Sequence, residues 1–570
     1  MPPPPRMRRR SRVATLLLWG VTALAGACRG GDRPVEGRRA ATETPDTGGT
    51  AVLAMQNDMQ RPMPLFASST VDAGLDQIMY MGLLRALWRD GRLVYETSEE
   101  NPMAMAWLYE YLPPDSTALR FRLRSDLLWS DGTPITAHDV VWTYRTAADP
   151  RTASPYQSVT AQLDSVVAEN DSTMVFHFRR RYPEMLFDTG INIAPRHVYE
   201  GTTPAQLRTH RSLADPANGN LVVSGPFQIG NWQQGQQITL VRNPHFRVRP
   251  LLDTIVIRVI PEPTTRLVEL QTGGVDMAYN VAFDQIPQIR AQASDVRLER
   301  QEKRVFDYVA YNPRAVPAFA DPDVRRALGL AIDVPAILRA LQMEEWAVPA
   351  GGPYPPIFRD LYDPERMAPL PHDPAEARRI LESKGWRDSD GDGILERNGR
   401  PLRFTLLTNS GNQTRADVSQ ILQQQWRQIG ADVRLQQLEF NTFFDRLLRK
   451  NFEAALGGWG VELSPNLTGF WGKDAPFNIV GYENPEATAL MEQALAQPTR
   501  ERALPFWQAA AERIVADQPY TWLYFHDRVS AVNERLRGMR IDSYSAFQNA
   551  WEWWIPADRQ RGGAAAAPQQ

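Results

Sequence analysis

The chain has 570 residues, of which 43% are hydrophobic and 23% are charged, and its formal net charge is −3. These proportions are typical of a packed globular protein, and they exclude a mainly disordered chain, a collagen and a coiled coil. The slight negative charge argues against nucleic acid as the main partner. At about 100–200 residues per domain, the length predicts three or four domain-sized units or two large lobes.

The first 27 residues have the pattern of an export signal. Five arginines within 6–12 precede the apolar segment 13–24, and the small residues Ala25, Gly26 and Ala27 follow. This order of positive, apolar and small residues predicts a signal peptide over 1–27. No later run of about 20 apolar residues predicts a membrane-spanning helix.

The only cysteine, Cys28, comes directly after these small residues. The segment Ala25-Gly26-Ala27-Cys28 resembles the lipobox of bacterial lipoproteins, with Ala25 where that motif most often has Leu. The resemblance implies cleavage before Cys28 and a diacylglycerol on its thiol. The alternative is an unmodified signal peptide with an incidental cysteine. Cleavage would remove five arginines and no acid, which takes the formal net charge from −3 to −8.

Two terminal segments have the composition of loose chain. The segment 28–49 is rich in Gly, Pro and Thr after Cys28, which predicts a flexible tether with a reach of roughly 25 Å. The C-terminal segment 557–570 ends in RGGAAAAPQQ, and we predict that it is a disordered tail.

Strand and helix patterns alternate between these ends. Residues 119–123 alternate apolar and polar side chains, which is typical of a half-buried strand. Thr136 and Asp139 have the spacing of a capping box and predict the start of a helix. Further strands are predicted at 174–178, 255–260, 404–407 and 433–435, and further helices at 374–385 and 418–429. The chain is therefore predicted to be an α/β protein with mixed sheets.

Signatures of catalysis and of metal binding are missing from the sequence. It contains no HExxH, GxSxG or P-loop motif, and its seven histidines have no pair at metal-ligand spacing. We therefore predict no enzyme activity, no catalytic residues, no metal site and no cofactor. A glycosidase needs only two facing carboxylates, which a sequence cannot reveal, so an exported hydrolase stays open as an alternative.

The segment 388–394 (DSDGDGI) begins like a calcium-binding loop, with acids at alternate positions and glycine at the sixth. The twelfth position of such a loop is Gly399, so the bidentate glutamate is missing. We favour a Gly/Asp turn before the strand near 402–407, and calcium binding stays open.

Six phrases, in order along the chain, resemble the extracellular solute-binding proteins of the oligopeptide/dipeptide/nickel class. Each phrase alone is a weak signal, whereas six in the family's order are specific. The phrases lie at 119–144 (LRFRLRSDLLWSDGTPITAHDVVWTY), 224–246, 269–278, 308–333, 373–395 and 423–462.

The resemblance implies a two-lobed periplasmic-binding-protein-like fold of class II type, with an extra domain inserted in lobe one. Carried onto this chain, lobe two covers 271–519 and the extra domain covers 76–189. The chain would cross between lobes near 263–270 and 519–525, and Pro261 and Pro263 suit a stiff crossover. Lobe one would combine 50–75, 190–270 and 520–556.

The resemblance also implies which residues contact the ligand. The family has a Trp followed by an Asp after a Gly-rich strand, and here Trp459, Gly460 and Glu462 stand in that phrase. Glu462 is one methylene longer than the family's Asp and would pair with the ammonium group of a peptide. Further candidates, by their position near cleft-facing segments, are Trp471, Tyr311, Asn312 and Tyr524.

The expected function is that of a substrate-binding lipoprotein of an ABC transporter, which captures peptides between two lobes. Its partners would be the peptide, a permease with its ATPase subunits, and the membrane through the anchor on Cys28. We expect a monomer outside the inner membrane, in the periplasm or another extracytoplasmic space. The alternative solutes are an oligosaccharide, an opine-like compound or a metal chelate.

Overall fold

The computed structural model describes residues 44–66, 70–89, 92–461, 463–543 and 545–561. Every described helix and strand lies within the unit Pro45–Gln570. Cys28 and Glu462 lie outside the described residues, so what the sequence predicts for them stays a prediction. Within the described residues, no helix combines the length and the apolar character needed to cross a membrane.

The largest sheet has eleven strands and mixes parallel with antiparallel pairs. Its order is β17-β16-β18-β12-β19-β11-β1-β10-β9-β8, and β13 pairs with β19 beside this path. The strands are β1 (Thr50–Met55), β8 (Phe227–Gln233), β9 (Gln237–Arg242), β10 (Thr254–Val259), β11 (Met277–Ala278), β12 (Val296–Tyr311), β13 (Ala347–Pro349), β16 (Arg403–Asn409), β17 (Asp432–Leu438), β18 (Ala454–Gly460) and β19 (Tyr520–Asn533).

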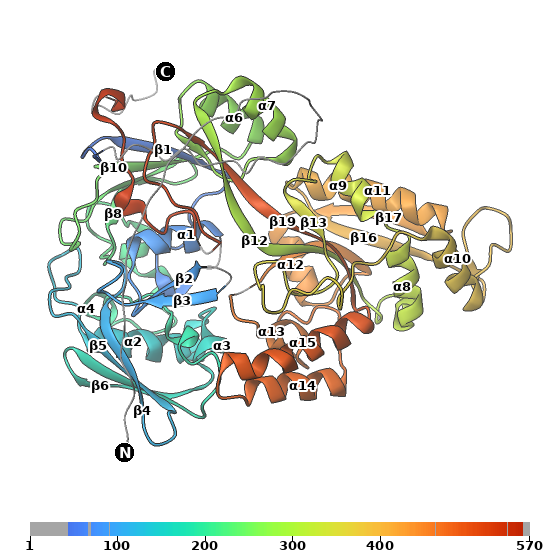
Figure 1. The fold of residues 1–570 in the computed structure, drawn as a ribbon, viewed down its shortest axis with the longest axis horizontal. Helices are drawn as coiled ribbons and strands as arrows, with labels where there is room; N and C mark the ends of the chain where they lie inside the picture. Colours follow the sequence, from blue (N-terminus) through green and yellow to red (C-terminus); the bar gives the residue numbers. More distant parts are fainter. Residues whose placement is uncertain (1–43, 67–69, 90–91, 462, 544, 562–570) are drawn as a thin grey trace, which may run out of the picture. The chain divides into compact units, whose positions relative to one another are not determined.

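Two long strands connect the two ends of this sheet. β12 and β19 pair antiparallel over most of their lengths, and Figure 1 shows them side by side in green and red. Their register shifts between Gln301 and Val305, and such an irregularity bends and twists a strand. Beyond the shift on one side β19 pairs with β11, and on the other side β12 pairs with β18. The sheet is therefore continuous, with an irregularity at its middle.

Residues 263–270, where the sequence predicts a crossover between the lobes, lie in a helix. α6 (Pro263–Gln271) begins at Pro263, because the first helical position needs no N–H donor. Its Leu267 packs into a core that also contains Val529 of β19. Pro263 starts this helix, and β12 and β19 are neighbours within the large sheet, so the crossover near 263–270 stays a prediction.

Two smaller antiparallel sheets lie within 76–189, the predicted inserted domain. One has the order β4-β5-β7-β6 and the other is the pair β2-β3. Thr136 and Asp139 form the predicted capping box at the start of α2. The elements of this region and the helix before it are α1 (Thr70–Met79), β2 (Arg85–Arg89), β3 (Arg92–Glu96), β4 (Ala106–Leu112), β5 (Ala118–Leu123), α2 (Ala137–Ala148), α3 (Gln157–Thr160), β6 (Leu163–Asn170) and β7 (Thr173–Phe178).

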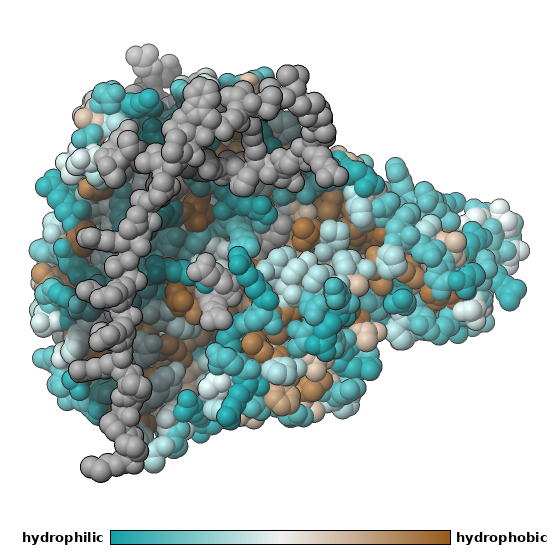
Figure 2. Space-filling model, in the orientation of Figure 1, coloured by the Kyte–Doolittle hydropathy of each residue, from teal (hydrophilic) through white to brown (hydrophobic). Residues whose placement is uncertain are grey.

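Along the chain, the remaining helices lie between strands of the large sheet. Two hydrophobic cores lie on opposite faces of β12, one containing Tyr308 and the other Tyr311, because side chains alternate along a strand. On the face of the molecule seen in Figure 2, hydrophilic residues dominate and hydrophobic residues form small separate groups. These helices and a short hairpin are α4 (Arg196–Tyr199), α5 (Arg211–Ala214), α7 (Ile286–Gln292), α8 (Pro322–Leu330), α9 (Val334–Ala340), α10 (Pro374–Ser383), β14 (Glu396–Arg397), β15 (Arg400–Pro401), α11 (Gln413–Gln428), α12 (Phe440–Leu448), α13 (Thr468–Trp471), α14 (Pro485–Leu495) and α15 (Arg500–Ala516).

The predicted α/β pattern is confirmed in its individual elements. The predicted strands are present as β5, β7, β10, β16 and β17, and the predicted helices as α2, α10 and α11. α11 begins five residues before the predicted 418, because Asn412 caps it by accepting a hydrogen bond from the backbone of Arg415. It ends as predicted at Gly430, which has a φ of +87°.

The predicted tether and tail both need correction at the ends nearest the body. Ala557 donates a backbone hydrogen bond to Asp46 over 2.8 Å, and the Gln560 amide donates to the backbone oxygen of Thr47 over 3.4 Å. A 3-10 turn covers Ala557–Arg559. Hydrogen bonds thus join 45–49 to 557–561, which composition alone does not predict.

Candidate functional site

An aromatic cluster surrounds Trp459, which lies near the end of β18. The Trp459 ring contacts Phe444, Phe470 and Phe477 at centroid distances of 6.0, 5.3 and 5.5 Å. Phe440 lies one turn before Phe444 on α12, and the two rings stack at 6.1 Å with an angle of 9° between their planes. We call these five rings the aromatic wall.

The aromatic wall has free surface and open space beside it. Phe440 is 52% exposed, whereas the other three phenylalanines are half-buried. A Cβ atom placed on Gly460 or on Gly469 would have no other atom within 4 Å. Because aromatic rings offer a large apolar area in a defined geometry, the wall is suited to take up an apolar group from solution.

Trp471 continues this cluster toward the core. It is 2% exposed and packs against Tyr520 at 4.7 Å, and Tyr520 stacks on Tyr308 at 4.3 Å. The indole N–H of Trp459 donates to the Tyr520 hydroxyl over 3.4 Å. Burial raises the pKa of Tyr520, so this hydroxyl stays protonated. Trp471 thus supports the wall from behind.

Three other predicted site residues lie apart from the wall. Tyr311 is 1% exposed, and its hydroxyl bonds to Thr521 over 2.9 Å. Tyr524 is fully buried in the same core as Tyr311, on the sheet face opposite Trp459. Asn312 donates to two backbone oxygens of the 450–452 loop at 2.9 and 2.7 Å. The structure therefore groups Trp459, Gly460 and Trp471, and separates Tyr311, Asn312 and Tyr524 from them.

A buried ion pair lies beside Gly458 on the strand that carries Trp459. Arg415 of α11 donates to Asp307 of β12 over 2.9 Å, and the two side chains are 13% and 5% exposed. Burial acts to lower the pKa of Arg415, but attraction by the Asp307 carboxylate outweighs it and the pKa is raised. A Cβ on Gly458 would lie 2.1 Å from an Asp307 oxygen. The absence of a side chain at Gly458 therefore leaves space for this ion pair.

Sequence reasoning did not single out this ion pair or the phenylalanines of the wall. Asp307 and Arg415 are 108 residues apart, and no local pattern connects them. Phe440 and Phe444 do carry a local signal, because residues four apart on a helix face the same side.

Comparison with known proteins identifies the family. Residues 103–479, more than half of the chain, match the family described as bacterial extracellular solute-binding proteins, family 5 Middle. The chain belongs to this family.

Relatives of this family 5 protein resemble it along nearly its whole length. It is 26% identical over 561 residues to the oligopeptide-binding protein AppA of Bacillus subtilis (strain 168), covering 96% of this chain and 99% of AppA. The structure of AppA from Bacillus subtilis in complex with a nonapeptide superposes with a TM-score of 0.78 at 25% identity, covering 90% of this chain and 100% of that one. NikZ from Campylobacter jejuni, in complex with Ni(L-His), shares the fold with a TM-score of 0.74 at 21% identity, covering 89% and 99%.

These matches confirm the predicted family and the predicted fold class. This family 5 protein has the mixed α/β, two-lobed fold of its structural relatives, and its role is to bind a solute. The lobe boundaries that the sequence predicts stay predictions.

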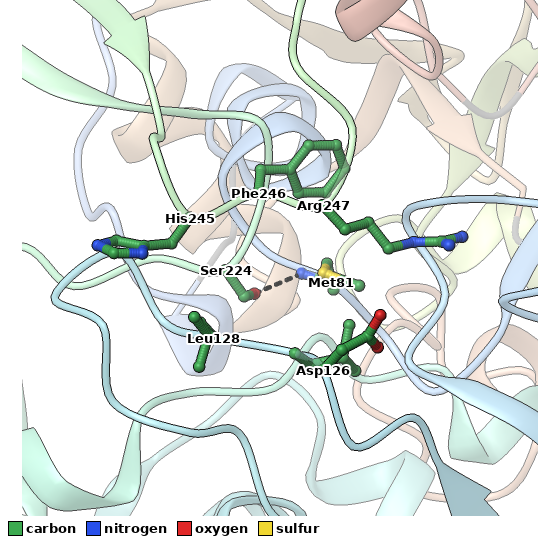
Figure 3. Close-up of a pocket in the computed structure, with 8 residues that line it drawn as sticks. Met81, Asp126, Leu128, Ser224, His245, Phe246 and Arg247 are labelled. Atoms are coloured by element: carbon green, nitrogen blue, oxygen red, sulfur yellow. Dashed lines mark hydrogen bonds between the residues drawn. The ribbon is translucent and has the colours of Figure 1, made fainter.

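Figure 3 shows a small pocket in which Met81, Ser224 and Phe246 lie close together, and Ser224 accepts a hydrogen bond from the Met81 backbone over 2.9 Å. Its volume is about 10 Å³, which is room for one water molecule. A more open groove of about 510 Å³ is lined by 359–366 and by Leu504, Pro505 and Gln508. The first pocket is too small to hold the solute of a family 5 protein.

The acidic loop has one more carboxylate than the sequence count predicts. Oxygens of Asp388, Asp390, Asp392 and Glu396 lie within 4.8 Å of one another, a spacing that could hold a cation. Glu396 stands at position nine rather than twelve of the loop. The same carboxylates accept backbone hydrogen bonds within the turn, including one from Gly391 to Asp388 over 2.7 Å. These bonds are consistent with the turn that we favour from the sequence.

Proposed function

We propose that this chain is the peptide-binding subunit of an ABC importer. The observation that carries the proposal is the similarity to AppA, a protein named as oligopeptide-binding and solved with a nonapeptide, along nearly the full length of both chains. We place the peptide between lobe two (271–519) and lobe one (50–75, 190–270 and 520–556).

Binding many peptide sequences requires holding what all peptides share. The backbone takes strand-like hydrogen bonds, and apolar side chains take contact with aromatic rings. In this proposal the aromatic wall contacts such side chains, with Trp459 as its centre and Gly460 leaving space beside it. Closure of the two lobes then excludes bulk water and shifts the population to a closed state.

The ammonium group of the peptide needs a carboxylate, because a charge removed from water must be paired. We assign this role to Glu462, on the basis of its place three residues after Trp459. Its neighbours Val461 and Leu463 are 8% and 0% exposed, so the chain on either side of it is packed against the protein.

We further propose that the protein acts at a membrane surface together with an ABC permease. Signal cleavage leaves Cys28 as a lipidated first residue, and acyl chains contribute about 0.8 kcal/mol per buried CH₂ to membrane binding. The protein then works as a monomer outside the inner membrane, passes its peptide to a permease with ATPase subunits, and catalyses no covalent reaction.

Native mass spectrometry of protein purified from cells tests the function. We expect a mixture of co-purified peptides, released intact on denaturation. A single sugar or a metal chelate would assign a different solute to the same fold. Cleavage of a bound compound, with release of its products, would instead indicate a hydrolase.

Calorimetry tests the assignment of Glu462. We expect Glu462→Ala to weaken binding of a co-purified peptide with a free N-terminus and to leave its N-acetylated form unaffected. Equal losses for both forms would remove Glu462 from this role. For the anchor, Cys28→Ser should move the protein from the detergent phase to the aqueous phase, and unchanged partition would contradict lipidation.

A further inference from the structure

A sequence-distant contact joins the predicted inserted domain to the predicted second lobe. Trp88 of β2 packs against Phe358 at 5.6 Å in a T-shaped arrangement. Arg181 donates a hydrogen bond to the backbone oxygen of Pro498 over 3.3 Å. Figure 1 shows the blue and cyan strands and helices of the inserted region next to the orange α13–α15. We call this region the lobe contact.

Glu184 is buried in the lobe contact. It is 7% exposed, and its Oε2 atom has no hydrogen-bond partner among the described residues. The Ser464 hydroxyl faces its carboxylate from the other side of the contact. Tyr354 donates to the backbone oxygen of the next residue, Pro465, over 2.7 Å, which holds the loop that carries Ser464.

The charged surroundings do not compensate an ionised Glu184. Arg500 faces it, but Arg500 forms an ion pair with Asp360 over 3.0 Å. Asp188, 9% exposed, adds a second acid and accepts a hydrogen bond from the Tyr182 hydroxyl. The titratable and charged groups that face Glu184 are Asp188 and Tyr182 from its own segment, Tyr95 from β3, Tyr354 from the loop after β13, and Arg500 from α15.

A carboxylate in such a place favours its neutral form, because taking an unpaired charge out of water costs several kcal/mol. We propose that Glu184 is a proton-operated latch: the lobe contact closes with Glu184 protonated, and ionisation of Glu184 opens it. The latch depends on the lobe contact alone, and it does not depend on which solute the protein binds.

The direction of the pH effect follows from linkage. Burial raises the pKa of Glu184 to about 7 in the closed contact, against the attraction of Arg500 and a hydrogen bond from Ser464, whereas a solvated glutamate titrates near 4.5. Below pH 4.5 Glu184 is protonated in both the open and the closed lobe contact, so pH does not affect closing. Between pH 4.5 and about 7, closing of the lobe contact takes up a proton. The equilibrium constant for closing therefore falls by up to about tenfold for each unit by which the pH increases. Burial also raises the pKa of Asp188 to about 8.

Spin-label distances test the latch without any ligand. In the full chain with Cys28→Ser, labels are attached at Arg180→Cys and Glu501→Cys, two exposed positions on either side of the contact. We expect the population with the short distance to dominate near pH 5 and to decrease between pH 5 and 7. Glu184→Gln should keep the short distance dominant over this same range, up to pH 7.

Asp164→Asn is the matched control, because Asp164 is an exposed acid of the same inserted region, and its profile should follow that of the parent. A parent profile that is flat between pH 5 and 9 would overturn the latch, whether or not Glu184→Gln folds. A Glu184→Gln profile that coincides with the parent would also overturn it. Neither result depends on whether the solute is a peptide.

Discussion

Asp307 on β12 and Arg415 on α11 form a buried ion pair of 2.9 Å directly beside Gly458. The pair joins a helix to the strand next to the one that carries Trp459. Arg415 also donates to Asn409 over 2.9 Å, which extends the link to β16. The position of the aromatic wall therefore depends on charges that do not belong to it.

Removing one partner of this pair should destabilise the protein strongly. Arg415→Met leaves Asp307 as an uncompensated buried charge, and we expect a loss of about 3–5 kcal/mol in the free energy of unfolding. Arg378→Met is the control, because its ion pair with Glu382 is exposed and should contribute little. Urea unfolding followed by tryptophan fluorescence measures both, and equal midpoints for the two variants would contradict the prediction.

A methyl group at position 458 should disturb the same pair. In Gly458→Ala the new Cβ would stand 2.1 and 2.2 Å from atoms of Asp307 and Arg415, so we expect a loss of about 1–3 kcal/mol from overpacking. Gly460→Ala, two residues along the same strand, meets no atom within 4 Å and should change stability by less than about 0.5 kcal/mol. The prediction fails if the thermal midpoints of the two variants agree.

Phe440 should affect binding more than folding. It is 52% exposed, so Phe440→Ser should leave the unfolding midpoint almost unchanged. If the aromatic wall contacts the solute, loss of one ring contact of about 0.5–1.5 kcal/mol weakens binding about two- to tenfold. Leu448→Ser is the control on the same helix, because Leu448 is also exposed, at 38%. Calorimetry with the co-purified solute would sink the idea if both variants bind like the parent.

Asp76 should make stability depend on pH. It accepts a hydrogen bond from Asn192 over 2.6 Å, yet burial raises its pKa to about 7. The folded pKa lies above the ordinary 3.8. The loss of folding stability that comes from ionising buried Asp76 is therefore absent below pH 3.8 and grows as the pH rises toward 7. Asp76→Asn should therefore be more stable relative to the parent at pH 8 than at pH 4. Urea midpoints at the two pH values measure this, and a difference that is the same at both would refute it.

Local sequence signals predicted the helices and strands. Contacts between distant segments determine which residues lie together at the candidate site. The start of α2 at Thr136 and the end of α11 at Gly430 depend on a few adjacent residues, so the local sequence is sufficient to predict both helix ends. The face on which a strand residue lies depends on register, and β12 shifts register between Asp307 and Tyr308. Tyr311 was a candidate because of its position near cleft-facing segments, and the alternation of the strand places it on the sheet face opposite Trp459. Glu184 carries no sequence signal, because its burial arises from segments that are far away in the chain.

The backbone N–H of Ala557 donates to the Asp46 carboxylate over 2.8 Å, so the two ends of the folded body lie next to each other. A short linker from residue 561 to residue 45 would therefore close the polypeptide into a ring without stretching any strand. Circular permutants with new termini in a surface turn, such as the one at 398–399, should keep the same architecture.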